Sequence, residues 1–97
     1  MRNVNASLKK WITTTAERNE LINTLTANLT MLRARLSVSQ EDIAKFVGIS
    51  RQTYSAVERG KRPMSWQLYL ALILFFDENE ATHNLLSHLN CYPYSLK

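Results

Sequence analysis

The chain has 97 residues, a net charge of +4 and an ordinary apolar content, which fits one domain with a single modest core. It contains only two glycines and two prolines, too few for a many-stranded fold that turns often. A single cysteine excludes an intramolecular disulfide framework and favours a reducing, cytoplasmic setting. Because the apolar runs are short and no signal peptide is recognisable at the start, we expect no membrane partner.

Residues 1–24 are predicted to form a helical extension. Apolar residues recur at helical spacing and predict a helix at 7–22, with one side formed by Leu8, Trp11, Ile12 and Ile22. The β-branched run at 13–15 is expected to weaken this helix. The apolar side has two possible partners: the helix predicted at 66–76 of the same chain, or the same segment of a second subunit. Packing on the same chain is favoured because the stripe is short and interrupted by polar residues.

The segment 39–62 predicts two short helices joined by a tight turn. It follows a helix expected at 25–36, whose inward side is Leu25, Leu29, Leu32 and Leu36. Ser39 is placed to cap a helix at about 40–47, and Ser50 to cap one at about 51–59. Between them Gly48 stands where the chain must turn with a positive φ, which glycine tolerates at the least steric cost.

The helix predicted at 51–59 has two chemically different faces. Tyr54 and Val57 share one face, and the opposite face is polar or small: Arg51, Gln52, Ser55, Ala56 and Arg59. Arg, Gln, Ser and Ala suit the edges of base pairs in the major groove of DNA. Positive charge concentrates in the same region, since residues 33–62 carry a net +4, against +2 before them and −2 after them. The pattern therefore predicts a helix-turn-helix that binds DNA.

The rest of the chain predicts two more helices and a tail. Ser65 is placed to cap an apolar helix through Phe76, and residues 77–79 break the chain before a last helix at about 80–89. Residues 90–97 are predicted to be an irregular tail. The expected division is therefore an extension at 1–24, a DNA-binding domain at 25–89, and this tail.

Residues of about 26 to 76 resemble the helix-turn-helix of phage repressors and Cro proteins, also called the xenobiotic-response-element type. The matching pieces are LRARL, SQEDIAKFVGISRQTYSAVERGKRP and SWQLYLALILFF. The resemblance implies an all-α, lambda-repressor-like domain of about five helices, to which the N-terminal helix is added. It also implies sequence-specific binding of double-stranded DNA by a homodimer, whose second helix lies in the major groove, and regulation of transcription as a repressor.

The resemblance assigns roles to individual residues. The first, second and sixth positions of the recognition helix read bases, so Arg51, Gln52 and Ala56 are the expected readers, and Ser55 shares their face. Ala56 offers only a methyl contact, so direct reading depends mainly on the other two. The residues expected to contact backbone phosphates are Gln40, Ser50, Arg59, Lys61 and Arg62. Arg33 and Glu58 are expected to form a structural ion pair.

One alternative function stays open from the sequence. The chain fits an antitoxin, which would bind a toxin protein as its partner and regulate its own gene through the same helix-turn-helix. An apolar, uncharged surface on residues 7–22 or 80–97 would favour that reading.

Catalysis, metals and cofactors find no support in the sequence. No spacing typical of a nucleophilic triad is present, and no glycine-rich phosphate loop, so we expect no enzyme activity and no cofactor. His83, His88 and Cys91 do not make a metal site, because the two histidines point about 140° apart around a helix and a fourth ligand is missing.

Overall fold

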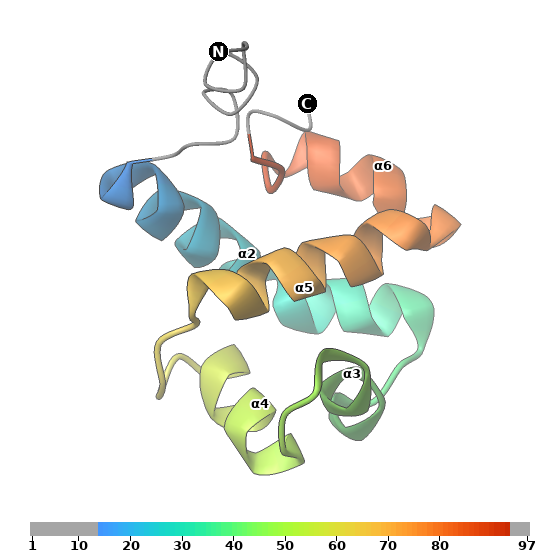
Figure 1. The fold of residues 1–97 in the computed structure, drawn as a ribbon. Helices are drawn as coiled ribbons and strands as arrows, with labels where there is room; N and C mark the ends of the chain where they lie inside the picture. Colours follow the sequence, from blue (N-terminus) through green and yellow to red (C-terminus); the bar gives the residue numbers. More distant parts are fainter. Residues whose placement is uncertain (1–13, 94–97) are drawn as a thin grey trace, which may run out of the picture.

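The computed structural model describes residues 14–93, and Figure 1 shows them as an all-helical fold with no strand among these residues. The described helices are α2 (Thr15–Leu36), α3 (Gln40–Val47), α4 (Arg51–Glu58), α5 (Trp66–Glu78) and α6 (Glu80–His88). Helices α3 and α4 lie at one end of the molecule, α6 lies at the other, and α5 runs across the middle in front of α2 (Figure 1). The predicted all-α helix-turn-helix fold is confirmed.

Helix α2 corrects the prediction of two helices at 7–22 and 25–36. It begins at Thr15 and continues without a break to Leu36. The threonine run expected to weaken the helix supplies its cap instead, because Thr14 and Glu17 form a reciprocal capping box. Further along, hydroxyls such as that of Thr26 donate to the carbonyl four residues back, so these polar residues stay within the helix.

The predicted boundary between residues 24 and 25 therefore falls inside a continuous helix. Of the apolar side predicted for residues 7–22, Ile22 packs against the core. Leu8, Trp11 and Ile12 lie outside the described residues. The division into an extension and a domain, as a statement about parts that fold separately, stays a prediction.

The turn between α3 and α4 follows from its capping residues. Ser39 and Asp42 form a capping box at the start of α3, and the Ser50 hydroxyl accepts the Thr53 amide at the start of α4. Gly48 ends α3 with a φ of 82°, in the left-handed region. The two helices begin where the sequence predicts, and their apolar sides turn together toward α2 and α5.

The chain after α6 makes core contacts that the sequence did not predict. Residues 91–93 are irregular, as expected, yet Cys91 and Tyr92 are buried. The chain leaves α6 through Asn90, whose φ of 57° directs the next residues back over the core. The hydroxyl of Tyr69 then donates to the carbonyl oxygen of Cys91, which fixes this end of the described chain on α5. Cys91 and Tyr92 are therefore part of the core.

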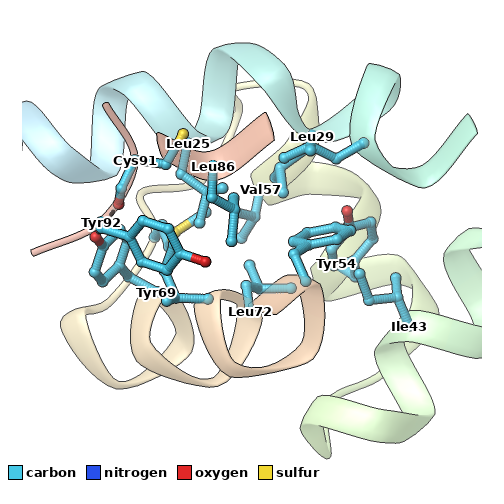
Figure 2. Packing of buried hydrophobic residues seen from close by; sticks show 14 of the residues in the cluster. Leu25, Leu29, Ile43, Tyr54, Val57, Tyr69, Leu72, Leu86, Cys91 and Tyr92 are labelled. Atoms are coloured by element: carbon cyan, nitrogen blue, oxygen red, sulfur yellow. Dashed lines mark hydrogen bonds between the residues drawn. The ribbon is translucent and has the colours of Figure 1, made fainter. Parts of the chain in front are cut away.

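The core lies between all five described helices, α2 to α6 (Figure 2). Its largest fully buried side chains include two tyrosines and one phenylalanine: Tyr54, Tyr69 and Phe76. Aliphatic side chains of α2, α5 and α6 fill the space between the aromatic rings, among them Leu25, Leu29, Leu72 and Leu86. Burial of this apolar surface holds α4 against the other helices, while its opposite side stays accessible to solvent.

Candidate nucleic-acid interface

Helix α4 presents its polar face to solvent. Tyr54 and Val57 are buried, whereas Arg51 and Gln52 are exposed on the opposite side, at the start of the helix. Ser55 and Ala56 are half-buried beside them. The four residues expected to read bases therefore share one accessible stretch of a single helix. Arg and Gln each offer paired hydrogen-bonding groups to purine edges in the major groove.

The start of α4 uses the hydroxyl of Ser50 for its own structure. This Oγ accepts from the Thr53 amide at 3.0 Å and donates to the Thr53 hydroxyl at 2.9 Å. The two hydroxyls hold two protons and one of these bridges the pair, so the other remains for an acceptor outside the protein. Thr53 was not among the predicted site residues. Its position three residues after a serine cap is the sequence signal that could have indicated it.

Glu58, at the end of α4, accepts hydrogen bonds from three helices. Arg33 of α2 donates through Nε to Oε1 and through Nη2 to Oε2, each at 2.8 Å. Tyr54 of α4 and Thr30 of α2 add their hydroxyls at 2.6 and 2.8 Å, and Gln40 of α3 adds its amide at 3.3 Å. We call these five residues the Glu58 cluster. It joins the C-terminal end of α4 to α2 and to the start of α3.

The electrostatics of the Glu58 cluster favour the ionised carboxylate. The Glu58 side chain is only 6% exposed and that of Arg33 16%. Burial alone would raise the pKa of Glu58, but the hydrogen bonds from its four partners outweigh it and lower the pKa to about 2. The same contact, a hydrogen bond from Arg33 to Glu58, raises the pKa of the guanidinium. Both groups are therefore charged at neutral pH.

Gln40, expected to contact a phosphate, also belongs to the Glu58 cluster. One N–H of its amide is directed to Glu58. A primary amide has two donors, so the second remains for a partner outside the protein. The sequence assigned Gln40 and Glu58 to separate roles, whereas the structure brings their side chains into contact.

The basic residues after α4 are all exposed, and the backbone orders the turn that carries them. Gly60 has a φ of 73°, and the amide of Lys61 donates to the Ala56 carbonyl at 2.8 Å. This is the hydrogen bonding of a Schellman motif, which ends a helix through a left-handed residue. Arg59 bends back and donates from Nε to the Ser55 carbonyl at 3.3 Å. The side chains of Lys61 and Arg62 extend this cationic edge beside α4.

Other kinds of site find little support in the described part of the chain. Between residues 14 and 93, no three histidine, cysteine or acidic side chains gather closely enough to hold a metal ion. His83 contacts Asp77 and Tyr92 rather than the other residues weighed as ligands. No described helix has the length and apolar character that crossing a bilayer requires.

The sequence of this region is similar to that of known proteins. A family model described as a helix-turn-helix domain matches residues 24–86, more than half of the chain. An uncharacterized HTH-type transcriptional regulator of Methanocaldococcus jannaschii is 46% identical over 44 residues, which cover 45% of this chain and 67% of that protein. The search of solved structures gave no match.

Proposed function

The chain belongs to the helix-turn-helix domain family, and we propose that it is a regulator of transcription that binds double-stranded DNA sequence-specifically. In this proposal α4 lies in the major groove and Arg51 and Gln52 read base edges. The observation that supports it best is that α4 is held by a buried ionic cluster on one side while its polar residues remain accessible on the other.

The phosphate contacts are proposed on the residues that border α4. Lys61 and Arg62 follow it on an exposed turn, and Gln40 begins α3 with one amide proton unused. Arg59, Ser50 and Thr53, whose hydroxyl is hydrogen-bonded to that of Ser50, complete the set of proposed phosphate contacts. Contacts of this kind fix the orientation of the protein on DNA and make its affinity depend on salt.

Within the family, we propose the Cro and phage-repressor type and a repressing role. One reader of this size covers a half-site, so the proposed active species is a homodimer on two half-sites about one helical turn apart. The antitoxin alternative called for an apolar surface near the ends of the chain. The exposed positions of α6 are mostly polar or charged: Glu80, Ala81, His83, Asn84, Ser87 and His88. The described C-terminal part therefore gives that alternative no support.

Selection of bound sites from a random duplex library tests the proposal directly. We expect the full chain to enrich a sequence made of two related half-sites. On the selected duplex, Lys61→Ala should weaken binding to all sequences about equally and lower the log–log salt slope by roughly one unit, because one phosphate contact is lost. Enrichment of no sequence would overturn the proposed function, and an unchanged salt slope would remove Lys61 from the interface.

A further inference from the structure

The outer face of α5 carries an apolar patch that the core does not use. Leu70 and Leu74 lie one turn apart and are 42% and 54% exposed, with Ala71 between them. Phe46 of α3 is 53% exposed, and its ring lies 4.8 Å from that of Phe75, beside the same helix. We call Phe46, Leu70, Ala71 and Leu74 the α5 patch. Grouped exposed apolar side chains mark interaction surfaces, whereas scattered ones need no explanation.

The charges of α5 make this face complementary to itself. The helix carries charged side chains only at its C-terminal end, Asp77 and Glu78, and its first turn has no acid. The N-terminal end of any helix bears a partial positive charge from its free amides. Two copies of α5 packed antiparallel place each acidic end beside the positive end of the other helix. A parallel pair would bring the acidic ends together.

The position of α5 in the fold suits the same arrangement. It crosses the molecule between the end that holds α4 and the end that holds α6, and α2 packs against its inner side (Figure 1). A twofold axis that runs from one end to the other, in front of α5, makes the two α5 helices antiparallel. The same rotation leaves both α4 helices at one end of the pair. Two readers on the same side are what two half-sites on one face of a duplex require.

We propose that the α5 patch is the contact between two copies of this chain. Ala71 lies nearest the axis, where its small side chain lets the helices approach, and each Leu70 meets the Leu74 of the other copy. Four side chains per copy make a small interface, below the size of stable dimers. The pair is therefore weak in solution and is completed when two copies occupy adjacent half-sites, so the biological role of the patch rests on the proposed function.

Crosslinking tests the contact without any DNA. Ala71→Cys is treated with a short bis-maleimide at increasing protein concentration, and Ala27→Cys on the outer face of α2 is the matched control. Cys91 is buried and burial raises its pKa to about 11, so it should react slowly. The wild-type chain, treated in the same way, measures the crosslinking that Cys91 contributes. We expect covalent dimers from Ala71→Cys alone. Equal crosslinking of the two variants, or none, would overturn the proposal.

A charge in the patch tests its role on DNA. Leu74→Glu places an unpaired carboxylate against Leu70 of the other copy on both sides of the axis, so on a selected two-site duplex it should reduce the binding of the second copy about tenfold or more. Ala27→Glu adds the same charge to α2 and should leave the binding of the second copy unchanged. Neither variant should change binding to a duplex that carries a single half-site. Equal effects of the two variants would contradict the proposal. A loss of urea stability by Leu74→Glu, with assembly unchanged, would show that the chain covers its own patch and would also contradict it.

The two readouts separate this inference from the proposed function. Crosslinked dimers from a chain that selects no duplex would reject the function and keep the contact. A chain that selects two half-sites but yields no Ala71→Cys dimer would keep the function and reject the contact.

Discussion

Two polar clusters, at opposite ends of the molecule, hold segments onto the same core, and they differ in burial. The Glu58 cluster joins α4 to α2 and α3, and its central ion pair is 6% and 16% exposed. At the other end, Asp77 accepts the Tyr92 hydroxyl at 2.5 Å and lies 3.0 Å from Nδ1 of His83. That second pair is 39% and 55% exposed. Water can replace the contacts of Asp77 and cannot replace those of Glu58.

The difference separates a cluster that fixes the reader from one that only fastens the end of the described chain. Base reading needs side chains held in place by a rigid support, and the Glu58 cluster fixes α4 to α2 and α3 through Glu58 and the buried Tyr54. No proposed role depends on the position of Tyr92 to the same degree. We therefore expect the removal of a carboxylate to lower the free energy of unfolding more at the Glu58 cluster than at Asp77.

The largest effect is expected from Glu58→Ala. The change leaves the buried Arg33 without its counter-charge and removes the acceptor of Tyr54, so it should lower the free energy of unfolding by about 3–5 kcal/mol in urea titrations. Glu41→Ala is the matched control, because Glu41 and Lys45 form a solvent-exposed pair at 4.0 Å. It should cost at most about 0.5 kcal/mol. Similar losses for the two variants would show that burial of the pair is not what matters.

A double change separates the pair from the space it fills. Arg33→Met combined with Glu58→Leu removes both charges and keeps much of the volume, so it should recover part of the loss caused by Glu58→Ala. Recovery stays incomplete because Thr30 and Tyr54 still lack an acceptor. A double variant less stable than Glu58→Ala would contradict this account of the cluster.

The pH dependence of stability should report the same cluster. The pKa of Glu58 is lowered from 4.5 to about 2 by its hydrogen bonds, so the ionised group stabilises the fold above about pH 4.5. This stabilisation should be lost as the pH falls from about 4.5 toward 2, and linkage makes it on the order of 3 kcal/mol. Urea titrations of wild type and Glu58→Gln across this range provide the measurement. Parallel curves for the two proteins would mean that Glu58 does not have a lowered pKa.

The smallest effect is expected at the other end. Asp77→Ala removes an acceptor of Tyr92 and the partner of His83, yet both acid and imidazole are accessible to water. The loss of unfolding free energy should be about 1 kcal/mol. Specific DNA binding should not change. A loss as large as that of Glu58→Ala would remove the contrast between the two clusters.

The fold was predictable where short-range rules decide it. Serine caps and Gly48 define the helix-turn-helix from adjacent residues alone, and both helices begin where these residues predict. The start of α2 depends on a choice between Thr14 as a cap and Thr14 as a helix residue, which apolar periodicity does not decide. Burial of Cys91 depends on contacts with Tyr69, 22 residues earlier, and no local pattern contains them.

The candidate site was predictable as a set of residues but not as a set of contacts. Arg51 and Gln52 could be placed on the outer face of a helix from periodicity, because a surface position needs no partner. The five residues of the Glu58 cluster come from three helices. Family resemblance indicated the ion pair alone. The contribution of Gln40 depends on how α3 and α4 pack, which the sequence does not specify locally.

The central claim is that α4 reads base pairs, and base preference tests it most directly. Arg51→Ala and Gln52→Ala, measured on the selected duplex and its single-base variants, should each relax the preference at one position per half-site. Each should cost about 1–3 kcal/mol of specific binding, while non-specific binding changes less. If both variants retain the base preference of the wild type at every position, α4 does not read the sequence.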